Sequence, residues 1–342
     1  MPPFTPRLTF LSLSTLTVPR SYYLGHHAAG LNSMRTLLGS IDLVIECRDY
    51  RTPITSRNPL FEQFLGERPR LIVYTKKDLG SNATSQDSER ESTIREWYKP
   101  TPTLFASTFE RSTVRSVLDF CREHAKSISS HLFGTRLLIV GMPNVGKSSL
   151  LNALRNTSLN RRKAARTGDQ PGVTRKVGTA VKIIETNTPG EAGNVYVLDT
   201  PGVFVPYVPD AESMLKLALC GNVKEGIIPP ETVADYLLYH INRHDPEVYG
   251  GWCEPTNEVP ALLDALARKQ GRLKKGGEVE LEGAALQFIQ KWRAGELGRF
   301  VLDDVTRSSL EERTRLVEGM GGSWNQARRQ IKAEKRLRTQ TK

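Results

Sequence analysis

The segment at residues 141–149 combines residue types that bind phosphate. It reads Gly-Met-Pro-Asn-Val-Gly-Lys-Ser-Ser and matches the pattern G-x-x-x-x-G-K-[ST]. Its glycines allow backbone N–H groups to surround phosphate oxygens, and the positive end of a following helix favours negative charge at the same place. Lys147 would then contact the β and γ phosphates, and Ser148 would offer its hydroxyl to Mg²⁺. The segment, called the P-loop below, predicts a nucleoside triphosphate site.

The nature of the base is indicated by residues 75–78, which read Thr-Lys-Lys-Asp. The Asp78 carboxylate can accept hydrogen bonds from the N1–H and the amino group of guanine, whereas adenine lacks this pair of donors. The wrong base would leave the carboxylate unpaired, so such a site discriminates strongly. The aliphatic stem of Lys76 can cover the ring face. Taken alone the pattern is more often a charged turn, but together with the P-loop it predicts a guanine nucleotide.

Two further segments would complete the pocket. Residues 199–202 read Asp-Thr-Pro-Gly, so Asp199 is a candidate Mg²⁺ ligand and the N–H of Gly202 is a candidate γ-phosphate contact. Ala106 and Ser107 end another short apolar segment and would present backbone groups to the guanine carbonyl.

Thr174 is the candidate switch threonine, with Thr167 and Thr179 as alternatives. Ser148, Thr174 and Asp199 would together hold Mg²⁺. The predicted GTP-binding residues are Thr75, Lys76, Asp78, Ala106, Ser107, Asn144, Val145, Gly146, Lys147, Ser148, Ser149, Thr174, Asp199 and Gly202.

Strands and helices must position these segments. Short apolar stretches that end in loop residues predict parallel strands at 41–47, 71–74, 103–106 and 136–140. A further strand at 195–198 is expected to pair with 178–185 as a hairpin. Helices are expected at 88–98, 113–127 and 148–155. The alternation predicts an α/β fold, a mostly parallel sheet flanked by helices, with ligands at the carboxyl ends of the strands.

The order of the segments along the chain is unusual. Residues 75–78 and 105–107 precede the P-loop, whereas an ordinary G domain has them after it. The same sheet can form, because packing sets which strands are neighbours. The sequence therefore predicts a P-loop NTPase G domain with circularly permuted motif order. Residues 199–202 then lead directly into the next region, so loss of a γ-phosphate contact would act on that region without an intermediary.

The pattern changes after residue 209. Amphipathic helices separated by Gly and Pro are expected at 210–220, 231–244, 260–269 and 281–295. They predict an all-helical C-terminal domain. The expected organisation is a basic leader at 1–24, a G domain at 25–207, a helical domain at 208–325 and a basic tail at 326–342.

The composition adds three expectations. The net charge of +11 favours a polyanionic partner such as RNA or an acidic membrane surface, with a solvated basic surface as the alternative. No run approaches the roughly 18 apolar residues that a membrane-spanning helix needs. The cysteines lack the spacing of a zinc site and are expected to be reduced thiols; they are Cys47, Cys121, Cys220 and Cys253.

The N-terminal residues have the composition of a mitochondrial presequence. Asp42 is the first acidic residue, and the preceding chain carries Arg7, Arg20 and Arg35 among many Ser, Thr and Leu residues. The alternative is an untargeted tail that lacks acidic residues. We expect import into mitochondria.

These segments resemble the circularly permuted GTPases of the YlqF/RbgA type. Tyr50 is a departure, because the family usually has a small residue there. The basic leader makes the sequence similar to the mitochondrial branch, whose members assist assembly of the large subunit of the mitochondrial ribosome and are associated with the matrix side of the inner membrane. The resemblance covers the nucleotide-binding segments and, beyond them, Gly25, His26, 49–53, 56–59, 274–277 and 298–300.

The resemblance also bears on catalysis. Val203 stands where many GTPases carry a water-positioning glutamine, and valine cannot orient water. The resemblance implies that His26 takes this role beside Lys147, and the alternative is that His26 packs locally. In related GTPases that lack the glutamine, an asparagine at the position of Asn144 helps to bind K⁺. We therefore hypothesise that K⁺ accelerates turnover.

The sequence thus predicts a GTPase, converting GTP to GDP and phosphate, that acts as an assembly factor for the large mitochondrial ribosomal subunit. It is expected to be a monomer, stimulated by ribosomal particles and in peripheral contact with the inner membrane. The alternatives are an RNA- or membrane-binding adaptor with negligible turnover, and a cytosolic or nucleolar relative. The residues expected to contact rRNA, besides the tail, are Arg155, Arg161, Arg162, Lys163 and Arg166.

Overall fold

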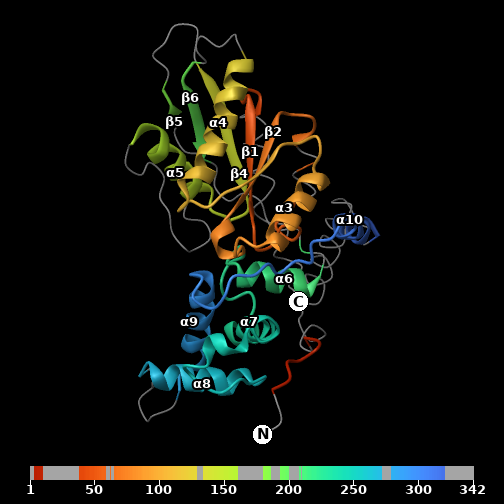
Figure 1. Cartoon of the computed structure of the whole chain (residues 1–342), viewed down its shortest axis with the longest axis vertical. Coiled ribbons are helices and arrows are strands. Elements are labelled where there is room, and N and C mark those ends of the chain that lie inside the picture. Colours follow the sequence, from red (N-terminus) through yellow and green to blue (C-terminus); the bar gives the residue numbers. More distant parts are fainter. Residues whose placement is uncertain are drawn as a thin grey trace, which may run out of the picture.

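The computed structural model describes residues 4–10, 38–58, 62, 65–128, 134–160, 180–185, 193–199, 208, 210–271 and 279–319. In this part of the chain an α/β region is followed by a group of helices. Figure 1 shows the α/β region in its upper half and most of these helices in its lower half. The predicted fold class, a mostly parallel sheet with flanking helices and a helical C-terminal region, is confirmed.

The sheet of the described chain has six strands in the order β3-β2-β1-β4-β6-β5. All neighbours pair in parallel except β5 and β6, which form the predicted antiparallel pair. The strands are β1 (Leu43–Asp49), β2 (Arg70–Thr75), β3 (Thr103–Phe105), β4 (Thr135–Gly141), β5 (Val181–Ile184) and β6 (Val195–Asp199).

The position of β1 differs from the prediction. The strand begins two residues later than the predicted 41–47 and runs on through Arg48 and Asp49. Two successive charged residues are typical of a loop, yet all seven residues of β1 are buried. They remain in the strand because ion pairs within the protein compensate their charges, as described below.

Helices cover both faces of the sheet. Leu43, Ile45 and Cys47 face the helices α4 (Arg111–Ser127) and α5 (Lys147–Leu159) in one large apolar cluster. On the opposite face, Ile72 and Tyr74 pack with Ile94 of α3 (Ser85–Trp97). The alternation follows from the two-residue period of a strand.

Helix α3 begins earlier than predicted because its first turn is capped. Thr84 is the N-cap, and its hydroxyl accepts a hydrogen bond from the Asp87 N–H, while the Asp87 carboxylate accepts one from the Thr84 N–H. This reciprocal arrangement satisfies two backbone donors at the start of the helix. The predicted start at 88 overlooked this signal.

The C-terminal region contains α6 (Ala211–Leu219), α7 (Pro230–His244), a 3-10 turn η4 (Pro246–Tyr249), α8 (Val259–Lys269) and α9 (Leu281–Arg293). Helix α7 packs against α6, α8 and α9. Its apolar residues belong to the same cluster as the α4–α5 face of the sheet. The apolar core therefore continues from one region into the other.

The chain after α9 returns to the α/β region. The Leu302 N–H donates to the Arg51 carbonyl over 2.8 Å, and the Trp97 Nε1–H of α3 donates to the Thr306 carbonyl over 3.1 Å. Helix α10 (Ser309–Gly319), which the sequence analysis missed, lies beside α3 (Figure 1).

Residues 4–10, part of the predicted leader, pack against α7. Arg7 forms an ion pair with Asp235, with Nη2 and Oδ1 2.5 Å apart. Phe10 is buried and meets the Tyr236 ring edge to face, with centroids 5.2 Å apart. This part of the chain therefore contributes to the core of the helical region.

Candidate functional site

Three of the predicted binding segments lie at the carboxyl ends of strands β2, β4 and β6 of the same sheet. In the sheet register Thr75 of β2 lies beside Asp49 of β1, and Cys47 of β1 lies beside Gly141 of β4. Asp199 of β6 lies beside Ile139 of β4. The strands are parallel, so residues 75–78, the P-loop and the end of β6 share one edge of the sheet. Ligands of open α/β sheets bind at such an edge.

The P-loop connects β4 to α5. Gly146 is the N-cap of α5 with φ 98°, a conformation that favours glycine. Asn144 adopts φ 55° although it has a side chain. The first turn of α5 contains Lys147 and the half-buried Ser148. The backbone therefore has the turn and the helix start that phosphate binding requires.

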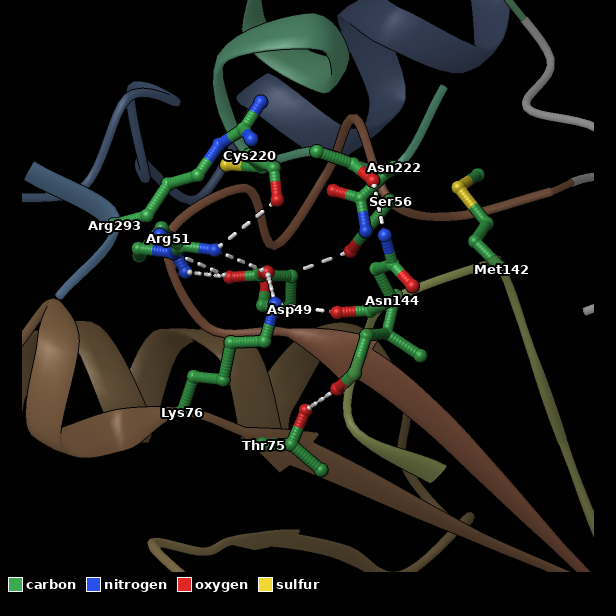
Figure 2. Close-up of polar contacts among 12 residues, drawn as sticks. Asp49, Arg51, Ser56, Thr75, Lys76, Met142, Asn144, Cys220, Asn222 and Arg293 are labelled. Carbon is green, nitrogen blue, oxygen red and sulfur yellow. Dashed lines mark hydrogen bonds and ion pairs between the residues drawn. The ribbon is translucent and has the colours of Figure 1, made fainter. Parts of the chain in front are cut away.

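Thr75 and Lys76 hold the P-loop from the side of β2. The Thr75 hydroxyl contacts the Val145 carbonyl, and the Lys76 ammonium donates to the Asn144 carbonyl (Figure 2). A side chain at Gly146 would approach the Thr75 hydroxyl to 3.4 Å. The segment 75–78 is thus bound directly to the P-loop, despite their reversed order along the chain. Lys76 braces the loop, a role the sequence analysis did not foresee.

The remaining predicted residues of this edge fall into two groups. Lys147 is buried and its ammonium donates to the Met142 carbonyl of the same loop over 2.8 Å. Asp78 lies half-buried in the 3-10 turn η3 (Lys77–Leu79) that follows Lys76. Ser149 is half-buried in α5. All three belong to the segments that meet at this edge.

The backbone donors of Ala106 and Ser107 have partners within the protein. The Ala106 N–H donates to the Tyr74 carbonyl over 2.8 Å, and the Ser107 N–H donates to the Thr113 hydroxyl over 3.0 Å. A guanine carbonyl that accepts a hydrogen bond from the Ser107 N–H would therefore replace the Thr113 hydroxyl as its acceptor.

A buried charge network lies beneath the P-loop. Arg51 donates to both carboxylate oxygens of Asp49, over 2.9 and 2.8 Å, and Lys76 reaches the same carboxylate over 3.0 Å (Figure 2). Burial alone would raise the pKa of Asp49, but the two cations hold it well below its ordinary value. Asp49 therefore stays ionised and fixes Lys76 against the loop.

The network reaches the helical region. The Arg51 guanidinium lies over the Trp292 ring of α9, 4.8 Å from its centroid. Arg51 also donates to the Cys220 carbonyl over 3.5 Å. Residues 49–53 were noted only through the family resemblance, and no local pattern assigned a role to Asp49 or Arg51.

Tyr50, the departure from the family pattern, is accommodated by glycine. The ring is fully buried and meets Phe105 edge to face, with centroids 5.8 Å apart. A side chain at Gly80 would come within 2.8 Å of this ring. Burial raises the pKa of the Tyr50 hydroxyl to about 12. The larger residue thus fills space that Gly80 leaves open.

Some predicted residues lie outside the described part of the chain, and the backbone of Asp199 is described without its side chain. The described residues contain no group of three His, Cys, Asp or Glu placed to hold a metal ion, and no helix among them could span a membrane. The cysteines of the described chain are free thiols. Outside the description are His26, Thr174, Gly202, Val203, Arg161, Arg162, Lys163, Arg166 and the tail.

Comparison with known proteins found a matching family model and similar solved structures. The family model described as a 50S ribosome-binding GTPase matches residues 136–248, which begin at β4 and leave out residues 75–78. A solved structure of GNP-bound YlqF from T. maritima covers 80% of this chain and 96% of its own, at 23% identity and a TM-score of 0.49.

Curated relatives match over most of the chain. Mitochondrial GTPase 1 of Schizosaccharomyces pombe is 38% identical over 309 residues, 86% of this chain and 92% of the relative. Mitochondrial ribosome-associated GTPase 1 of Bos taurus is 34% identical over 300 residues, 82% of this chain and 88% of the relative. Together with the permuted site, these matches confirm the resemblance noted in the sequence: the chain is a GTPase and belongs to the mitochondrial GTPase 1 family.

Proposed function

We propose that the protein binds the large subunit of the mitochondrial ribosome in the matrix, hydrolyses GTP there with Mg²⁺, and regulates maturation of the subunit and mitochondrial translation. The observation that carries the proposal is the bracing of Val145 and Asn144 by Thr75 and Lys76, which brings the proposed base-reading segment into direct contact with the P-loop. Support for the ribosomal target comes from relatives that are named mitochondrial ribosome-associated GTPases.

In the proposed pocket Asp78 reads the guanine edge, and the Ser107 N–H donates to the guanine carbonyl in place of the Thr113 hydroxyl. The P-loop binds the phosphates, and Lys147 turns from the Met142 carbonyl to the β and γ oxygens. The Met142 carbonyl is a neutral acceptor, so the charged phosphate oxygens would attract the ammonium more strongly. The proposed GTP-binding residues are Thr75, Lys76, Asp78, Ala106, Ser107, Asn144, Val145, Gly146, Lys147, Ser148, Ser149, Thr174, Asp199 and Gly202.

The test of base reading is Asp78→Asn. The amide presents a donor where the carboxylate accepted, so it suits xanthine, whose C2 carbonyl replaces the guanine amino group. We expect GTP affinity to fall at least about 100-fold and binding of xanthosine triphosphate to appear, both measured by nucleotide titration. Unchanged GTP affinity would refute the role of Asp78.

We propose that Ser148, Thr174 and Asp199 hold Mg²⁺, which neutralises charge on the phosphates. Support comes from Ser148 in the first turn of α5 and from the Asp199 backbone one strand away, beside Ile139 of β4. Removing Mg²⁺ with a chelator should abolish hydrolysis, measured as phosphate release.

We propose His26 as the group that positions the attacking water, because Val203 cannot do so. His26→Ala should lower kcat at least about tenfold with little change in nucleotide affinity, whereas His27→Ala, its neighbour, should not. Equal kcat for the wild type and His26→Ala would refute the role.

A K⁺ ion at Asn144 is a separate proposal. The side-chain NH₂ of Asn144 donates to the Gly221 carbonyl over 2.9 Å. The side-chain oxygen of Asn144 points away from that carbonyl, and it is the atom that would bind K⁺. Hydrolysis should be faster in K⁺ than in Na⁺ buffer at equal ionic strength. Identical rates in the two buffers would remove the ion from the mechanism.

The proposed contact with rRNA rests on charge. Acidic residues outnumber basic ones in the described helical region, so the surplus of the whole chain, +11, comes from other segments such as 161–166 and the tail. Sedimentation with large mitochondrial subunits should give stronger binding with a GTP analogue than with GDP, and binding should fall steeply with salt. Equal binding with GTP analogue, GDP and no nucleotide would contradict the switch.

The second candidate is an adaptor that holds GTP with negligible turnover, and Val203 is the feature that favours it. Phosphate release with and without large subunits separates the two candidates, since the adaptor would remain slow in both. We also propose a monomer with peripheral contact to the inner membrane. Alkaline carbonate should then extract the protein from mitochondrial membranes.

A further inference from the structure

The turn that follows α6, residues 220–222, lies directly on the P-loop. Gly221 has φ 75°, the left-handed conformation that ends many helices. Its N–H donates to the Ala218 carbonyl over 3.0 Å, and the Asn222 N–H donates to the Leu217 carbonyl over 2.8 Å. These two bonds form the Schellman arrangement, which holds the turn in one shape. We call residues 220–222 the α6 turn.

Arg293 of α9 fixes the same helix end. Its guanidinium donates to the Leu219 carbonyl over 2.8 Å and to the Ala218 carbonyl over 2.7 Å. A cation at a helix C-terminus satisfies the last carbonyls and suits the negative end of the helix dipole. The position of the α6 turn is therefore set by the helical region.

Two reciprocal hydrogen bonds join the α6 turn to the P-loop (Figure 2). The Asn222 amide donates to the Pro143 carbonyl over 2.8 Å, and the Asn144 amide donates to the Gly221 carbonyl over 2.9 Å. Asn222 is completely buried. A buried amide that lost its acceptor would be costly, so both bonds resist separation of the two segments.

These bonds act on the part of the loop that faces the phosphates. Asn222, Lys76 and Thr75 contact the carbonyls of three consecutive residues, which are Pro143, Asn144 and Val145. In a trans peptide the N–H points opposite to the C=O. Holding these carbonyls outward therefore turns the N–H groups of residues 144–146 inward, where phosphate oxygens bind.

We propose that Asn222 is a positioning residue for nucleotide binding, so that the helical region supplies one of the three braces that shape the P-loop. The inference rests on the proposed nucleotide role of the P-loop. Nucleotide affinity then depends on the α6 turn, and by thermodynamic reciprocity bound nucleotide stabilises the α6 turn. This route is separate from the link through residues 199–202.

The test compares Asn222→Ala with Asn242→Ala. Asn242 is a matched control, since it is a buried asparagine of the same helical region whose amide donates to the Thr256 carbonyl over 2.8 Å, away from the P-loop. Asn222→Ala should raise the Kd for GDP about three- to tenfold, and Asn222→Asp should raise it further because a carboxylate repels the Pro143 carbonyl. Asn242→Ala should change the Kd less than about twofold, although it also removes a buried hydrogen bond.

Hydrogen exchange of the unmodified chain gives an independent readout that needs no variant. GDP should slow exchange of the Gly221 and Asn222 amides, and it should leave the Gln270 amide at the end of α8 unchanged. Unaltered Kd in a folded Asn222→Ala variant, or equal exchange of the α6 turn with and without GDP, would overturn the inference. A wild-type chain that binds no guanine nucleotide would instead overturn the proposed site itself.

Discussion

Strand β1 carries two buried charge clusters that differ in what they touch. The first joins Asp49, Arg51 and Lys76 and contacts the P-loop and the helical region. In the second, Arg48 donates to Glu46 over 2.6 Å and to Glu62 over 2.8 Å.

The second cluster contacts other parts of the chain. Glu62 also pairs with Arg57, and the Arg48 guanidinium lies 4.6 Å from the centre of the Tyr98 ring. The same chemistry therefore serves different ends. The second cluster joins β1 to neighbouring chain segments by ion pairs. In the first cluster, Asp49 holds Lys76, which in turn contacts the P-loop.

The largest expected effect is loss of stability in the second cluster. Arg48→Met leaves the buried Glu46 and the partly buried Glu62 without their shared partner, which should lower the free energy of unfolding by about 3 to 5 kcal/mol. Urea unfolding measures this change. Arg70→Met is the control: Arg70 also pairs with Glu46 but is partly exposed, so about 1 kcal/mol or less is expected. Equal losses in both variants would show that burial of Arg48 adds nothing.

The pH dependence of stability tests the same cluster. Burial would raise the pKa of Glu62, but Arg48 and Arg57 hold it at about 2, below its ordinary 4.5. The ionised carboxylate therefore stabilises the fold above pH 4.5, and this contribution, about 3 kcal/mol, is lost as the pH falls through about 2. Glu62→Gln should flatten the acid limb of a stability–pH curve. An unchanged acid limb in that variant would contradict the assignment.

The first cluster should affect binding as well as stability. Asp49→Asn keeps the volume but removes the charge that anchors Lys76, so affinity for GDP should fall about tenfold, which corresponds to about 1.4 kcal/mol. Glu62→Gln, also a carboxylate-to-amide change, should leave the affinity within about twofold in the folded protein. Titration with a fluorescent nucleotide distinguishes them. Similar losses of affinity in both variants would erase the contrast between the clusters.

The smallest effect is expected at a rim pair outside both clusters. Arg7 and Asp235 are each about one-fifth exposed, at 22% and 20%. Arg7→Ala should lower the free energy of unfolding by about 1 kcal/mol or less and leave nucleotide affinity unchanged. Phe10→Ala removes a buried ring that packs against α7, so it should lower the free energy of unfolding more, by about 3 kcal/mol. A larger loss for Arg7→Ala than for Phe10→Ala would mean that charge, not packing, holds residues 4–10.

Much of the α/β region could be predicted from the sequence. The strands at 71–74, 103–106, 136–140 and 195–198 end within one or two residues of their observed limits, because each is a short apolar stretch closed by loop residues. The helices α7 and α8 begin one residue before their predicted starts, at Pro230 and Val259. The limits of β1 were further off, by two residues, because the strand includes the charged Arg48 and Asp49.

Local patterns also predicted which segments meet. In the P-loop and in residues 75–78, residue types at fixed spacing predict phosphate binding and guanine recognition, and each segment follows a strand. Parallel strands end at one edge of a sheet, so the convergence followed once the fold class was known. The permuted order did not matter, because the contacts depend on strand neighbours.

The sequence by itself determined the ligand class, the fold class and the permuted order, since these depend on local patterns of polarity and donor chemistry. Tertiary structure alone decided that Asp49 anchors Lys76, that Asn222 reaches Pro143, and that residues 4–10 lie on α7. The partners Asn222 and Pro143 are 79 residues apart, and Arg7 and Asp235 are 228 apart. No local pattern encodes such pairs, because each contact exists only after the sheet, the helices and the continuous apolar core have brought the side chains together.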